Sequence, residues 1–150
     1  MVPLGTVSAM PNRTRNVTAT LLRATAFTYL FDAGEGTQAQ ITSCFASSLR
    51  AIRRVFITHN HGDHLFGLPA VVSYVVQAQR AHESAGVAPA PRLQIFGPVG
   101  IHQFIRAALA SLGRAGLEKL PIDITELVTP GYRLPPAEVT ARTVCGRHAY

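Results

Sequence analysis

Four residues of the kinds that bind metal ions lie within six consecutive positions: His59, His61, Asp63 and His64. The apolar, β-branched segment 55–58 precedes them and predicts a buried strand. Side chains two residues apart on an extended chain point to the same side, so His59 and His61 can bind one ion together. Gly62 permits a sharp turn, after which Asp63 and His64 can reach a second ion. The stretch therefore predicts a metal centre at the end of a strand.

The H-x-H-x-D-H spacing outweighs the alternative that these are ordinary surface or core histidines. An apolar strand comes before the spacing and an apolar helix after it, so the context fits as well as the residue types. Nitrogen and carboxylate ligands together suit zinc. A pair of metal ions suits hydrolysis of a phosphoester or an ester.

The metal loop and its surroundings resemble the tRNase Z (ribonuclease Z) family of the metallo-β-lactamase superfamily. The loop reads FITHNHGDH at 56–64 and is followed by FGLP at 66–69. Three further segments match the family pattern: LGTVSA at 4–9, FDAGEGTQ at 31–38 and FGPVG at 96–100. A basic loop, PNRTRN at 11–16, is similar to the P-x-K-x-R-N loop of the family. The resemblance extends over about residues 4–112.

The resemblance implies an α/β fold, the four-layer αββα sandwich of the superfamily, of which residues 1–150 form mainly the first half of one domain. It implies a site with two Zn²⁺ ions and cleavage of precursor tRNA to remove its 3′ trailer. Asp63 then serves as a metal ligand and as the catalytic proton acceptor. The bridging carboxylate and last histidine ligand of the family are expected beyond Tyr150, so we expect the chain to be part of a longer protein.

His148 and Asp32 are two further candidates at the metal centre. His148 follows a V-T-A segment at 139–141 and is expected to complete the ligands of the first ion, with an ordinary surface histidine as the alternative. Asp32 resembles the aspartate that orients the histidine loop without binding metal. A carboxylate that caps the turn before Gly34 is the alternative for Asp32.

The basic loop supplies the expected contacts to RNA through Arg13, Arg15 and Asn16. Two guanidinium groups and an amide suit phosphate oxygens and base edges, and a solvated basic loop is the alternative. The formal net charge of +6 also suits a polyanion, although basic proteins with no nucleic-acid role exist.

The cysteine content and the hydropathy bear on location. Two cysteines do not make a disulfide scaffold, so we expect an intracellular setting, the cytoplasm before an organelle. No apolar run is long enough to span a membrane, so no membrane partner is expected. The resemblance adds a homodimer. Two other functions stay open: a hydrolase of small phosphodiesters or sulfate esters, and a catalytically incomplete RNA-binding fragment.

The hydrophobic periodicity predicts alternating strands and helices, typical of an α/β domain. A thiol at Cys44 is expected to be buried on the first helix. The predicted strands are 2–8, 17–24, 26–32, 52–58, 92–96, 122–127 and 139–145, and the predicted helices are 37–49, 64–82 and 99–112.

Overall fold

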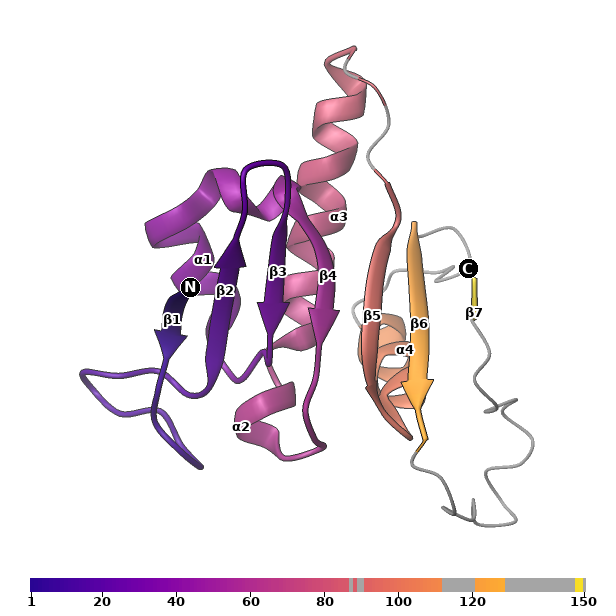
Figure 1. Ribbon diagram of the computed structural model, residues 1–150. Helices are drawn as coiled ribbons and strands as arrows, with labels where there is room; N and C mark the ends of the chain where they lie inside the picture. Colours follow the sequence, from indigo (N-terminus) through magenta and orange to yellow (C-terminus); the bar gives the residue numbers. More distant parts are fainter. Residues whose placement is uncertain (87, 89–90, 112–120, 129–147, 150) are drawn as a thin grey trace.

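The strands of the chain form one mixed sheet. The computed structural model describes residues 1–86, 88, 91–111, 121–128 and 148–149. Within these residues the spatial order of the strands follows the chain (Figure 1). The strands are β1 (Val2–Gly5), β2 (Ala19–Arg23), β3 (Thr28–Phe31), β4 (Ile52–Phe56), β5 (Leu93–Pro98), β6 (Ile122–Leu127) and β7 (His148–Ala149). The central strands β3 to β6 are parallel, and the outer pairs are antiparallel.

Helices connect the parallel strands. The longer helices lie behind the sheet in Figure 1, and the short helix of residues 62–65 lies beyond the lower ends of β3 and β4. They are α1 (Thr37–Phe45), the 3-10 helix η1 (Ala46–Ala51), α2 (Gly62–Leu65), α3 (Leu68–Ser84) and α4 (Ile101–Ser111). Right-handed crossovers between strands that follow one another in the sheet place their helices on one face. The helices bury Ile41, Val72 and Ile105 against Leu30 and Val55 of the sheet. The predicted α/β class is confirmed.

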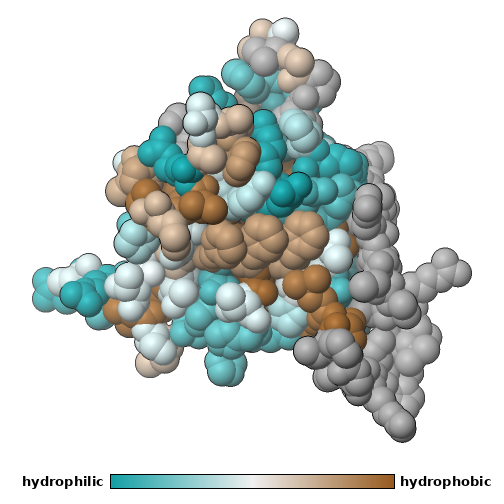
Figure 2. All heavy atoms as spheres, viewed as in Figure 1, coloured by the Kyte–Doolittle hydropathy of each residue, from teal (hydrophilic) through white to brown (hydrophobic). Residues whose placement is uncertain are grey.

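The other face of the sheet carries a row of aromatic rings. Phe31, Phe56 and Phe96 are register neighbours on β3, β4 and β5. Their rings stack with centroid separations of 5.1 and 5.2 Å. Figure 2 shows this row as a brown band across the middle of the visible face. The helices of the described residues lie on the opposite face, as expected for one half of a layered sandwich.

The predicted helix 64–82 is wrong in one respect, because two helices occupy it. The short helix α2 ends at Leu65, and α3 begins at Leu68 with Gly67 as its N-cap. The backbone N–H of Gly67 donates to the carbonyl of Ala33 at 2.8 Å, and a Cβ on Gly67 would lie 2.0 Å from the carbonyl oxygen of Gly34. The chain therefore turns where it passes closest to the segment after β3.

Other boundaries differ by a few residues. Strand β1 ends at Gly5 rather than residue 8, because the backbone N–H groups of Thr6 and Val7 both donate to the carbonyl of Asn16. The helix predicted at 37–49 ends at Phe45 and continues as 3-10 helix. Cys44 is exposed, so its predicted burial is wrong. The predicted strand 139–145 lies outside the described residues. In the described part of the chain, every helix is too short or too polar to cross a membrane.

Candidate metal centre

The carboxyl ends of β3 and β4 hold the candidate site. Asp32 follows β3, and its backbone N–H donates to the carbonyl of Phe56 at 2.8 Å. Ile57 directly follows β4, and its backbone N–H donates to the carbonyl of Phe96 in β5. The backbone therefore stays extended toward the histidines. Ligands of open α/β sheets bind at this end, because the loops that leave parallel strands meet there.

His59 and His61 form the first pair of candidate ligands. His59 Nε2 lies 3.1 Å from His61 Nδ1, and the two ring centroids are 4.6 Å apart. Two nitrogen ligands at roughly 2.0–2.1 Å from one tetrahedral zinc ion lie about 3.3 Å from each other. The other nitrogen of His59, Nδ1, lies 3.0 Å from the hydroxyl of Thr58. The two facing nitrogens are therefore spaced as ligands of one ion.

Asp63 and His64 form a second pair beside the first. Asp63 Oδ2 lies 3.6 Å from His64 Nε2, and the rings of His59 and His64 are 4.0 Å apart between centroids. Among the described residues, no three His, Cys, Asp or Glu side chains form one group that could hold an ion. The geometry is two adjacent pairs, and each pair has fewer ligands than the three that catalytic zinc normally takes from protein.

Asp32 forms hydrogen bonds with His64 of the second pair and with Thr58, which lies beside the first pair. Its carboxylate accepts hydrogen bonds from the Thr58 backbone N–H at 2.8 Å and from the Thr58 hydroxyl at 3.0 Å. The other oxygen, Oδ2, lies 2.8 Å from His64 Nδ1. A carboxylate accepts hydrogen bonds, so His64 Nδ1 is the donor in this contact, and Nε2 is the ring nitrogen that faces Asp63. Asp32 is 5% exposed and has a left-handed φ of 57°, a conformation that aspartate adopts more readily than most residues.

A backbone group from a distant loop holds Asp63. The N–H of Ala9, in the loop between β1 and β2, donates to Asp63 Oδ2 at 2.9 Å. This hydrogen bond is the main cause that lowers the pKa of Asp63, and the neighbouring His64 lowers it further. Asp63 is therefore ionised at neutral pH, as a metal ligand must be.

Arg13 and Arg15 are exposed in the same β1–β2 loop. The side chain of Asn12 shapes this segment by accepting from the backbone N–H groups of Thr14 and Arg15 at 3.0 and 2.8 Å. A cavity of about 310 Å³ lies between this turn, β1 and α1. The side-chain nitrogen of Asn16 is buried and lacks a hydrogen-bond partner within the described structure. Of the three predicted RNA contacts, the two arginines are available at the surface.

The described structure includes the backbone of His148 but not its side chain. Its backbone lies in β7, where it pairs with Ile124. The predicted metal-binding role of His148 therefore concerns a side chain outside the described structure, and it stays a prediction.

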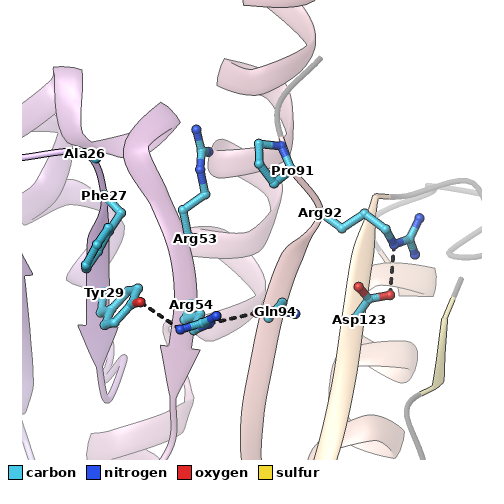
Figure 3. Close-up of a pocket in the computed structure, with 9 residues that line it drawn as sticks. All are labelled: Ala26, Phe27, Tyr29, Arg53, Arg54, Pro91, Arg92, Gln94 and Asp123. Atoms are coloured by element: carbon cyan, nitrogen blue, oxygen red, sulfur yellow. Dashed lines mark hydrogen bonds and ion pairs between the residues drawn. The ribbon is translucent and has the colours of Figure 1, made fainter. Parts of the chain in front are cut away.

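A second cavity lies elsewhere in the described structure. It has a volume of about 520 Å³ and opens at the amino ends of β3, β4 and β5 (Figure 3). Arg54 donates to the hydroxyl of Tyr29 at 2.7 Å and to the side chain of Gln94 at 2.8 Å. Arg92 forms an ion pair with Asp123 at 2.8 Å. This basic pocket is separated from the histidines by the length of the strands.

Sequence reasoning missed two residues of the site. Thr58 bonds to Asp32 and lies beside two histidines, and its position directly before the first histidine was the available signal. Ala9 contributes only a backbone N–H, at a left-handed φ of 66°, and nothing in its side chain indicates that contact.

Comparison with protein families finds one matching family model. Residues 1–88 match a family described as Anti-Pycsar protein Apyc1. This segment includes the β1–β2 loop, Asp32 and the whole metal loop, and it covers more than half of the chain.

Curated relatives share substantial sequence identity with the chain. The chain is 42% identical over 104 residues to zinc phosphodiesterase ELAC protein 1 of Mus musculus, covering 68% of this chain and 26% of that protein. It is 38% identical over 146 residues to ribonuclease Z of Oceanobacillus iheyensis, covering 95% of this chain and 44% of that protein. The chain thus spans less than half the length of these relatives.

Solved structures agree with the sequence comparison. The crystal structure of the short form of human tRNase Z (ELAC1) matches with a TM-score of 0.70 and 34% identity, covering 91% of this chain and 47% of that one. A metallo-β-lactamase-fold protein from Bacillus subtilis matches with a TM-score of 0.53 at 19% identity, which supports the fold alone. The chain therefore belongs to the family that the Anti-Pycsar Apyc1 model describes and, with its ribonuclease Z relatives, to the tRNase Z group of the metallo-β-lactamase fold.

Proposed function

We propose that the protein containing this chain is a zinc-dependent endoribonuclease that removes 3′ trailers from precursor tRNA. The observation that carries this proposal is the pairing of His59 with His61 directly beside Asp63 and His64. The relatives named ribonuclease Z and tRNase Z supply the substrate class. The name zinc phosphodiesterase in a 42% identical relative supports the metal.

The donor atoms fit zinc. His59 Nε2 and His61 Nδ1 would hold one ion, and Asp63 Oδ2 with His64 Nε2 would hold the second, with further ligands such as His148 completing the coordination. Imidazole and carboxylate donors at these separations suit zinc better than magnesium or calcium, which prefer oxygen ligands. When bound, zinc lowers the pKa of a coordinated water to about 7.

Asp63 is the proposed proton acceptor of the reaction. The hydrogen bond from Ala9 fixes its Oδ2 atom, so Oδ1 is the oxygen that would take the proton of the attacking water. The lowered pKa of Asp63 keeps this carboxylate ionised at neutral pH. Asp32 holds His64 through Nδ1, so Nε2 is the nitrogen that would bind the metal. These residues thus orient the ligands and accept a proton without needing to move far.

The proposed substrate contacts are electrostatic. Arg13 and Arg15 are exposed in the β1–β2 loop, and Ala9 of the same loop donates a hydrogen bond to Asp63, so this loop connects the proposed phosphate contacts to the candidate site. The formal net charge of +6 supports a polyanionic substrate. We extend the proposal to an intracellular, cytoplasmic setting, which rests on the low cysteine content, and to a homodimer, which rests on the family resemblance.

The test is cleavage by the purified full-length protein, loaded with zinc. The substrates are a precursor tRNA with a 3′ trailer and bis(p-nitrophenyl) phosphate, a small phosphodiester. We expect cleavage at the trailer that leaves a 3′-hydroxyl on the tRNA, and loss of cleavage after the metal is removed by chelation. Rapid hydrolysis of the small diester without trailer removal would favour the small-phosphodiester alternative. Binding of tRNA with no hydrolysis of either substrate would favour a non-catalytic RNA-binding protein.

A further inference from the structure

The residue between the two paired histidines reaches across to a neighbouring turn. Asn60 lies between His59 and His61, and its side-chain Nδ2 donates to the backbone carbonyl of Val99 at 2.9 Å. Val99 belongs to the short turn between β5 and α4. A hydrogen bond at this position limits the conformations that the histidine segment can adopt, because both candidate ligands are directly bonded to Asn60.

A buried carboxylate holds that turn. Glu126, near the end of β6, is 6% exposed, and its Oε1 accepts hydrogen bonds from the backbone N–H groups of Gly100 and His102, both at 3.0 Å. Two backbone N–H groups that donate to one buried oxygen fix the turn relative to β6. Gly100 has a left-handed φ of 95°, which glycine adopts at no steric cost. Glu126 therefore holds the backbone directly after the Val99 carbonyl.

We infer that Glu126 and Asn60 act in series as positioning residues for the histidine pair. Glu126 fixes the β5–α4 turn, the turn presents the Val99 carbonyl, and Asn60 uses that carbonyl to hold His59 and His61 at ligand spacing. This inference rests on the proposed function, because it assumes that the pair binds metal. Groups that orient ligands without touching the ion reduce the conformational cost of binding, and their loss lowers metal affinity.

The first experiment measures zinc affinity by competition with a chelator, starting from the metal-free full-length protein. Asn60→Ala should weaken binding by about tenfold, the low end of the effect seen when orienting groups are removed. The melting temperature of the metal-free protein should stay unchanged, because Asn60 is exposed. Gln77→Ala, which removes an exposed amide from α3, is the matched control and should leave the affinity unchanged. Equal affinities for the Asn60 and Gln77 variants would overturn the inference.

The second experiment tests whether the two residues act in series. Glu126→Ala should weaken zinc binding in the wild-type background and add little in the Asn60→Ala background, since the turn then no longer reaches the histidines. Glu126→Gln keeps the Oε1 acceptor, so it should stay near wild type and controls for folding. An equal loss from Glu126→Ala in both backgrounds would contradict the serial arrangement.

His59→Ala separates this inference from the proposed function. If His59→Ala binds zinc as tightly as wild type, the proposed centre itself is wrong. If His59→Ala loses zinc while Asn60→Ala keeps it, the centre stands and only the positioning role fails.

Discussion

The two ends of the same parallel strands differ in chemistry. At the amino ends of β3 to β5, a cavity of about 520 Å³ is lined by arginines and aromatic rings (Figure 3). At the carboxyl ends, the four candidate metal ligands lie within a few ångströms of one another. The cavity at the amino ends thus lies away from the candidate metal ligands, so the presence of a cavity alone would not have identified the candidate site.

The hydrogen bonds explain the difference. At the carboxyl ends, backbone N–H groups of Thr58 and Ala9 donate to Asp32 and Asp63, which fixes two carboxylates in defined orientations. At the amino ends, Arg54 bonds to the neutral side chains of Tyr29 and Gln94. Preorganised carboxylates and imidazoles can bind metal and move protons, whereas guanidinium groups cannot donate their protons to a reaction near neutral pH.

The largest expected effect comes from removing the Asp63 carboxylate at the carboxyl ends, and a carboxylate at the amino ends provides the control. In the full-length protein, Asp63→Ala should lower precursor cleavage by at least about a thousandfold, since it removes both a metal ligand and the proton acceptor. Binding of tRNA should change little, because affinity depends on phosphate contacts. Asp123→Ala, at the amino ends, is the matched control and should leave kcat nearly unchanged. Activity of Asp63→Ala within about tenfold of wild type would contradict its assigned role.

The second expected effect concerns Asp32, whose carboxylate bonds to His64 and Thr58. Asp32→Asn should weaken zinc binding about 10–100-fold, because an amide nitrogen cannot accept the hydrogen that His64 Nδ1 donates. Asparagine tolerates the left-handed φ of 57° at this position, so the variant should fold. Zinc titration of the metal-free protein measures the change. An unchanged affinity would show that Asp32 only caps the turn before Gly34.

The fold was largely predictable from hydrophobic periodicity, and the errors have identifiable causes. Strand 122–127 matched β6, because Ile122 and Ile124 alternate with Asp123 and Thr125. The helix 64–82 was predicted as continuous because its apolar residues repeat at helical spacing on both sides of Gly67. The close approach of Gly67 to Gly34, 33 positions earlier, breaks it, and local periodicity contains no information about such long-range contacts.

The candidate site shows the same division. His59, His61, Asp63 and His64 were predictable together because they are adjacent in the sequence and the structure brings them together. The orienting role of Asp32 was predicted from the family resemblance. In the structure its carboxylate lies within hydrogen-bonding distance of Thr58 and His64. The contacts from Ala9 and Glu126 were not predictable, because each joins residues far apart in the chain through backbone N–H groups.

The third expected effect compares the arginines of the two ends in RNA binding. Arg13→Ala with Arg15→Ala should flatten the slope of log affinity for precursor tRNA against log salt by up to about two units, because each lost phosphate contact removes roughly one. Arg53→Ala with Arg54→Ala removes the same charge at the amino ends and should leave the slope near wild type. A larger change from the second pair would mean that the tRNA binds over the basic pocket instead.

The smallest expected effect separates stability from function within the sheet. Arg54→Met removes two hydrogen bonds and the contact of the guanidinium with the Tyr29 ring, so it should lower the free energy of unfolding by about 1 kcal/mol, the net value of such partly exposed bonds. Zinc affinity should not change, because the residue lies at the other end of β4.

Thr58→Val keeps its backbone bond to Asp32 but loses the hydroxyl between Asp32 and His59, so it should weaken zinc binding several-fold at a similar cost in stability. Urea unfolding of the metal-free protein and zinc titration, applied to both variants, measure the two quantities separately. If Arg54→Met also weakened zinc binding, the two ends of the strands would be coupled, and the separation between scaffold and site drawn from their hydrogen bonds would be wrong.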